Sequence, residues 1–196
     1  MNNVKKKDWM RVFISTAPFL FFAGISIYFY FYSSPEQLVE WVGVENSYFL
    51  IFVLALLGGL TTFSGVPYHL VLITLAIGGL DPLPLGLSAA VGVILGDTTS
   101  YFVGYSGGEV MPSRVQRIVH RVYIYTDGYP KLLQVFFFSF AALTPISNDF
   151  IVISAGIAKY PFWKVMIPLA FGNLIFNITL AYFAIRAYGL LQGVLL

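Results

Sequence analysis

The chain consists of long apolar runs that are separated by short polar segments. Three runs are long: Val12 to Tyr32, Leu83 to Tyr105 and Phe162 to Tyr188. About 20 helical residues cross the hydrocarbon core of a bilayer, which is about 30 Å thick. The pattern therefore predicts three full transmembrane spans.

Four shorter apolar runs come in two pairs, and each pair is broken by turn-forming residues. The runs Ser47–Phe63 and Leu70–Ile77 are separated around "TTFSGVP", and the runs Leu132–Leu143 and Phe150–Ala158 by "TPISND". These runs fall short of a comfortable span, and broken backbone at membrane depth must be covered by protein or line water. We therefore expect two re-entrant helical hairpins.

The order of short run, break, short run and full span occurs twice, which predicts two repeats at 47–106 and 131–188. A shift of 80 residues places His69 over Asp149 and Asp97 over Asn177. Ser34 is a candidate cap for an intervening short helix. The single membrane domain 1–196 then comprises a cytoplasmic N-terminus and first span (1–32), an external amphipathic helix (33–46), repeat 1, a basic cytoplasmic loop (107–130) and repeat 2.

Composition supports a membrane protein. Hydrophobic residues make up 58% of the 196 residues and charged residues 10%, with a mean hydropathy of +0.81. A soluble domain carries about 25% charged residues. Because the chain has no cysteine, disulfides, thiol catalysis and thiolate metal sites are excluded.

The basic residues predict the orientation. With re-entrant hairpins and a cytoplasmic N-terminus, ten of the 11 lysines and arginines face the cytoplasm, and only Arg186 lies outside. Six plain spans would instead place Lys159 and Lys164 opposite Arg114 and Lys131. The charge distribution thus favours an all-α polytopic membrane protein with two opposed re-entrant helical hairpins in an inverted repeat.

Three segments resemble the DedA family, also called the VTT or SNARE-associated-like domain. They are "GVPYHLVLITLAIGG" (65–79), "LGDTTSYFVGYSGG" (95–108) and "TPISNDFIVISAGIAKYPFWKVMIPLAFGNLIFN" (144–177). The resemblance covers about 47–188. It implies a protein of a bacterial or archaeal cytoplasmic membrane that moves phospholipid or polyprenyl-phosphate lipid between leaflets, often with proton dependence.

The chain departs from this family pattern at the second break. The usual motif is Arg-Phe-x-Pro-x-x-Arg, and its arginine positions hold Ala142 and Asn148 here. Arginine can bind phosphate with two parallel hydrogen bonds, whereas asparagine has no charge to offer. We therefore expect a divergent member of the family.

Two aspartates and a histidine inside the apolar segments are the main candidates for function. Asp97 is either a proton or cation site or a structural hydrogen-bond acceptor, because an intramembrane carboxylate costs about 2.5–3.5 kcal/mol. Asp149 is a candidate site residue and, with Ser147 and Asn148, a candidate N-cap for the helix that follows; both roles can hold together, because a helix N-terminus at a break is itself a donor site for anions. His69 either exchanges protons with the aspartates or is a satisfied buried histidine.

The remaining candidates surround these residues. Asn173 and Asn177 lie four residues apart on one helical face, and we expect them to bond mainly to hairpin backbone. The loop arginines either face anionic headgroups or reflect the positive-inside bias. The predicted substrate or proton site comprises Asp97, Asp149, Asn148, His69, Pro145, Ser147, Thr144, Thr62, Asn177 and Asn173, and the headgroup-facing loop comprises Arg114, Arg117 and Arg121.

These observations predict a lipid transporter or scramblase, with protons as a candidate coupling ion. A small-solute or ion transporter and a non-transporting membrane scaffold are the alternatives. No nucleotide-binding loop, nucleophilic triad or zinc-ligand spacing is found, and His69 with two aspartates offers too few ligands for a metal. We expect membrane lipids as partners, no nucleic acid, no cofactor and no enzymatic activity; the sequence leaves the oligomeric state open.

Overall fold

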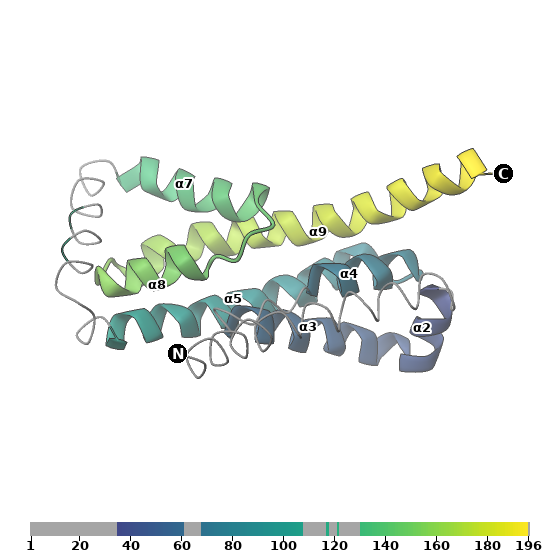
Figure 1. The fold of residues 1–196 in the computed structure, drawn as a ribbon, viewed down its shortest axis with the longest axis horizontal. Helices are drawn as coiled ribbons and strands as arrows, with labels where there is room; N and C mark the ends of the chain where they lie inside the picture. Colours follow the sequence, from purple (N-terminus) through teal and green to yellow (C-terminus); the bar gives the residue numbers. More distant parts are fainter. Residues whose placement is uncertain (1–34, 61–67, 108–116, 118–120, 122–129, 196) are drawn as a thin grey trace, which may run out of the picture.

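The computed structural model describes residues 35–60, 68–107, 117, 121 and 130–195 (Figure 1). These residues form helices, and no strand occurs among them. Several predictions lie outside the described residues: the span Val12–Tyr32, the Ser34 cap, Thr62, Arg114 and most of the loop 107–130.

Two long helices run along the molecule and contact each other. They are α5 (Pro82–Gly107) and α9 (Phe162–Leu195), and both are long and apolar enough to cross a membrane. Many of their outward side chains are large, apolar and exposed, such as Val91 and Phe171. The helices agree with two of the predicted spans, because each run is long enough to cross the hydrocarbon core as one helix.

The remaining described elements are short helices. They are α2 (Pro35–Val42), α3 (Val44–Leu60), α4 (Tyr68–Ile77), α7 (Pro130–Leu143) and α8 (Asp149–Ile157). The longest, α3, has 17 residues and extends about 26 Å at 1.5 Å per residue. Helix α3 begins at Val44, three residues before the predicted start, because only Gly43 separates it from α2, with a φ of 86°.

The two helices of each short pair pack on different long helices. Helix α3 lies along α5 and α7 along α9, whereas α8 packs on α5 and α4 on α9. Figure 1 shows α4 and α8 towards opposite ends of the molecule, with the α7–α8 connection near its centre. Each short helix that follows a break therefore packs on the long helix of the other half.

Two glycines, Gly92 and Gly172, allow the close contacts of α3 with α5 and of α7 with α9. A Cβ on Gly172 would lie 2.6 Å from the Phe138 carbonyl oxygen and 3.0 Å from the Ala142 nitrogen. A Cβ on Gly92 would likewise meet the backbone of Phe52 and Leu56. The backbones of α3 and α5, and of α7 and α9, thus approach too closely for any side chain at these positions.

The ends of α4 and α8 have the same backbone geometry, 80 residues apart. Gly79 and Lys159 have φ angles of 94° and 55°. The following amides donate back across each helix end, from Leu80 to the Leu75 carbonyl at 3.3 Å and from Tyr160 to the Ala155 carbonyl at 3.0 Å. Both ends are Schellman motifs, which satisfy terminal carbonyls without water.

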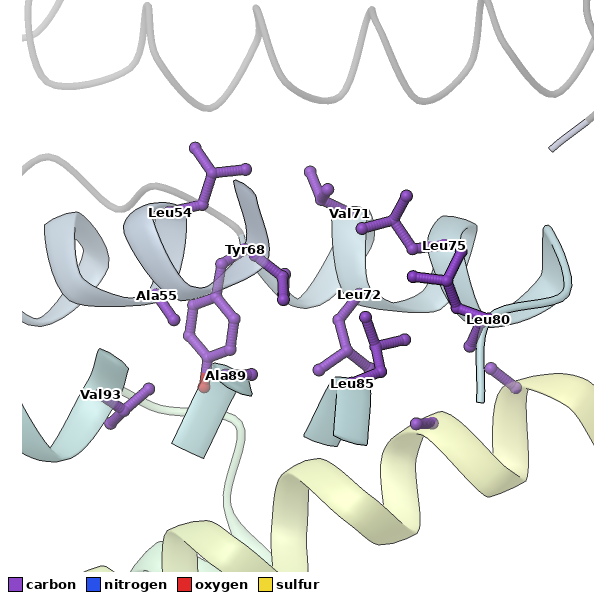
Figure 2. Close-up of a cluster of buried hydrophobic side chains, with 14 of the residues drawn as sticks. Leu54, Ala55, Tyr68, Val71, Leu72, Leu75, Leu80, Leu85, Ala89 and Val93 are labelled. Atoms are coloured by element: carbon purple, nitrogen blue, oxygen red, sulfur yellow. The ribbon is translucent and has the colours of Figure 1, made fainter. Parts of the chain in front are cut away.

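The buried apolar side chains form two clusters. In the first cluster, Tyr68 and Leu72 of α4 pack with Ala55 of α3, with Leu85 and Ala89 of α5 and with two alanines of α9 (Figure 2). The second cluster joins α5 and α7–α9 around the fully buried Phe137. These clusters position the polar residues that lie between them.

We expect Gly172→Ala to lower the free energy of unfolding by about 1–3 kcal/mol, because the new methyl group overlaps the backbone of α7. Thermal unfolding of the detergent-purified protein measures this change. Gly189→Ala, in the same helix with open space around it, is the matched control and should leave stability equal or slightly higher. Equal effects of the two substitutions would contradict the described packing of α7 on α9.

Candidate functional site

The connection between α7 and α8 brings polar side chains against the middle of the long helices. Asn148 is 5% exposed and Asp149 only 1%, and they lie beside Asp97 of α5, also 1% exposed. Asn173 and Asn177 of α9 are buried as well. Polar groups that are buried in this way require hydrogen-bond partners.

Asp97, Asn148 and Asn173 form a closed ring of hydrogen bonds. The Nδ2 atoms of Asn148 and Asn173 donate to Asp97 Oδ2, at 3.0 and 3.1 Å. Asn148 Nδ2 also donates to Asn173 Oδ1 at 3.0 Å. The ring joins α5, α9 and the break, so that one carboxylate oxygen receives two amide donors.

Asp149 is held separately from this ring. Its Oδ1 accepts a hydrogen bond of 2.7 Å from Ser100 and its Oδ2 one of 2.6 Å from Ser147. Ser100 Oγ also lies 2.9 Å from the carbonyl oxygen of Gly59, near the end of α3. Because Asp149 is in the first turn of α8, the helix dipole favours its negative charge there.

The structure shows which side chains of the second break bond to the start of α8. Asn148 occupies the N-cap position of α8, yet its side chain makes no capping hydrogen bond and turns to Asp97 instead. The backbone amide of Asp149 is 3.3 Å from Ser147 Oγ. Asn173 binds side chains rather than the expected hairpin backbone, and Asn177 Nδ2 donates to the Asn173 carbonyl in its own helix.

A cavity of about 320 Å³ lies beside the Asp97 ring. His69 forms part of its wall, with its ring 3.9 Å from the Tyr68 ring and 5.4 Å from the Phe176 ring, between centroids. The lining comes from α3, α4, α5, α7, α9 and the break. Its residues are Gly58, Gly59, Tyr68, His69, Val93, Asp97, Ala141, Thr144, Pro145, Ile146, Ser147, Asn148, Asn173 and Phe176.

Most of the predicted site residues meet at this cavity. Asp149 and Asn177 do not line it but bond to residues that do, and Arg117 and Arg121 are exposed outside it. Ser100 and Tyr68 belong to this site as well, although neither was among the predicted site residues. Ser100 lies three residues after Asp97 on the same helical face, and this spacing could have predicted that both side chains face the same site.

Among the described residues, no group of three or more histidines, cysteines, aspartates and glutamates could hold a metal ion. The polar side chains around the cavity are instead a single carboxylate, the His69 imidazole, amides and hydroxyls. This arrangement can bind a hydrogen-bonding group or exchange a proton at Asp97.

The fold and the buried polar site are those of a helical membrane protein. The family model of the VTT domain matches residues 66–186, more than half of the chain, and the chain therefore belongs to the VTT domain family, the DedA family. This family is membrane-associated, and its members are generally proposed to be transporters. Comparisons with curated proteins and with solved structures gave no match.

We expect Asn148→Ala and Asn173→Ala each to lower the free energy of unfolding, by about 1.5–3 kcal/mol, because each removes a hydrogen bond to a buried carboxylate. The double variant should lose less than the sum of the two, since each single substitution already breaks the hydrogen bond between Asn148 and Asn173. Unfolding in detergent measures the stability of the single and double variants, which together form a double-mutant cycle. Thr99→Ala, at an exposed position of α5, is the control with little effect; additive losses would contradict the ring.

Proposed function

We propose that this protein moves phospholipid or polyprenyl-phosphate lipid between membrane leaflets, past the cavity beside the break. The observation that carries the proposal is the Asp97 carboxylate, 1% exposed, held by two asparagine amides on the wall of a cavity. A transport pathway requires such a polar site within an apolar bundle, and membership of the VTT domain family supports transport.

The energetics of Asp97 support a functional role. A carboxylate deep in a membrane segment costs about 2.5–3.5 kcal/mol, and two amide hydrogen bonds recover only part of its hydration. A neutral residue could fill the same position without this cost. We therefore assign the carboxylate a role besides packing. A proton carried by Asp97 is our candidate for the ion that is coupled to transport.

The proposal includes two opposed re-entrant hairpins that form an inverted repeat. The matched glycine contacts at Gly92 and Gly172, and the matched turns at Gly79 and Lys159, support an internal repeat. The crossed packing of α4 and α8 supports opposite orientations. In such repeats, one half moves against the other around a fixed site, which alternately opens to each side.

A second candidate function is transport of a small solute or ion. The observation that favours it is the lining of the cavity: its described residues include no lysine or arginine to bind a lipid phosphate. Such a protein would pass a substrate-dependent ion or proton flux without moving lipid. A non-transporting scaffold would instead act through Arg117, Arg121 and the rest of the basic loop.

Reconstitution into liposomes with leaflet-labelled lipids tests the proposal. We expect the protein to accelerate translocation of at least one headgroup class above that of empty vesicles, and Asp97→Asn to reduce the rate about tenfold or more, because it removes the charge and the proton-binding group. Glu45→Gln, an exposed carboxylate at the start of α3, is the control that should retain the rate.

Two results would contradict lipid transport. One is translocation no faster than in empty vesicles across several headgroups, at several pH values. The other is a substrate-dependent proton flux in the same vesicles without lipid movement, which would establish the solute transporter. Loss of the cellular phenotype on charge reversal at Arg117 and Arg121, but not in Asp97→Asn, would establish the scaffold.

A further inference from the structure

Asp149 is a second buried carboxylate, apart from the ring of Asp97, and it is 1% exposed. Residues 46–80 and 165–185 contain no aspartate, glutamate, lysine or arginine. Of these four residue types, residues 82–108 contain only Asp97 and residues 132–158 only Asp149. A buried carboxylate is stable only where hydrogen-bond donors or a positive charge replace the water that it loses. No lysine or arginine of these segments supplies that charge, so the groups around Asp149 decide what compensates it.

Oxygen atoms from three parts of the chain meet at Asp149. Its Oδ1 lies 2.7 Å from Ser100 Oγ of α5, and its Oδ2 lies 2.6 Å from Ser147 Oγ of the break. Ser100 Oγ is also 2.9 Å from the carbonyl oxygen of Gly59, in the last turn of α3. The carboxylate, the two hydroxyls and this carbonyl form a group of oxygens that we call the Asp149 cluster.

The Asp149 cluster contains too few hydrogens for its close oxygen contacts. A hydroxyl supplies one hydrogen, yet Ser100 Oγ has two acceptors beside it. Ser100 donates to the carboxylate, because a charged oxygen is the stronger acceptor. The Gly59 carbonyl oxygen then faces Ser100 Oγ at 2.9 Å with no hydrogen between them. Two oxygens that face each other in this way repel, unless a cation contacts both of them.

The position of the cluster favours a small monovalent cation. Gly59 is one residue from the C-terminal end of α3, where the carbonyls have no partner within the helix and the helix dipole is negative. Gly59 and Ser147 also line the cavity, which gives an ion a route to the cluster. Carboxylate and carbonyl oxygens are the ligands of hard cations. A single carboxylate balances one positive charge, and closely spaced oxygens favour Na⁺ over the larger K⁺.

We infer that the Asp149 cluster binds a sodium ion, with the Asp149 carboxylate, Ser100 Oγ and the Gly59 carbonyl oxygen as its ligands. The inference goes beyond the proposed function, because it concerns an ion and a carboxylate that does not line the cavity. Helix ends and free carbonyls at breaks bind Na⁺ in other transporters with broken helices. A bound ion would connect the end of α3 to the start of α8 through α5, and would thereby stabilise the arrangement of these three helices.

Thermal unfolding of the detergent-purified full chain tests this inference, in the chloride salts of Na⁺, K⁺ and N-methylglucamine at equal ionic strength. We expect Na⁺ to raise the unfolding temperature in a saturable way, by about 3–6 °C at about ten times its dissociation constant. K⁺ should act about tenfold more weakly or less, and N-methylglucamine should have no effect. Equilibrium binding of radioactive sodium to the same protein measures the affinity directly.

Substitutions in the cluster locate the ion. Asp149→Asn and Ser100→Ala should each weaken sodium binding about tenfold or more, because the first removes the charge and the second removes a ligand. Thr99→Ala and Ser154→Ala are the matched controls in α5 and α8. Their hydroxyls donate to carbonyl oxygens of their own helices, at 3.1 and 2.6 Å, so both variants should bind sodium like the unsubstituted protein.

Either equal unfolding temperatures in the three salts or no saturable binding of radioactive sodium overturns the inference. Both measurements use the unsubstituted protein, so they hold even if a variant fails to fold. Sodium binding that persists in Asp149→Asn but is lost in Asp97→Asn also overturns it, because the ion then lies at the other carboxylate. The liposome assay is independent: lipid movement without sodium binding rejects the inference alone, whereas sodium binding without lipid movement rejects lipid transport alone.

Discussion

The hydrogen bonds between the Asp97 carboxylate and the Asn148 and Asn173 amides are the interaction on which the arrangement of this site depends. A carboxylate without donors could not remain at 1% exposure in an apolar bundle. Its two donors come from the break and from α9, so satisfying one charge fixes three segments relative to one another. The polar ring is therefore a structural constraint and, at the same time, the wall of the cavity.

Close backbone contact between the helices makes this ring possible. Gly96 of α5 lies against Gly59 of α3, and Gly104 of α5 lies against α8 at Ile153 and Gly156. With larger side chains at these crossings, the break would lie further from Asp97, beyond the reach of a short amide. Interfaces of small residues serve the same purpose in other membrane proteins, where close approach replaces the hydrophobic effect between helices.

The sequence predicts the elements of this fold better than it predicts their contacts. The long apolar runs predicted α5 and α9, and the proline, serine and asparagine at 145–148 predicted the break before α8. Helical periodicity, however, could not tell whether Asn148 caps α8 or turns away, because the competing partner, Asp97 of α5, is distant in the sequence and close only in the fold. The start of α3 was missed since one glycine, Gly43, ends α2 without a polar linker.

In the candidate site, too, the sequence predicted which residues matter but not which contacts they make. Asp97 and Asp149 stood out in the sequence as charges inside apolar runs, yet nothing in the sequence assigned one to the cavity and the other to two serines. That assignment follows from the register between α5 and α8, which Gly104 and Gly156 set by backbone contact. Local patterns carry no information about such a register.

The replacement of arginine by asparagine at position 148 has a direct electrostatic consequence. Asn148 Nδ2 lies 3.0 Å from Asp97 Oδ2, and the positive side chain expected there from the family pattern would form an ion pair with it. Asparagine keeps the hydrogen bond but removes the opposing charge, and residues 46–80, 82–108 and 165–185 hold no lysine or arginine that could substitute. A site that pairs its own charge can accept a neutral or anionic group. This site retains a buried carboxylate that no lysine or arginine of those segments neutralises, so the two asparagine amides are the groups that stabilise it.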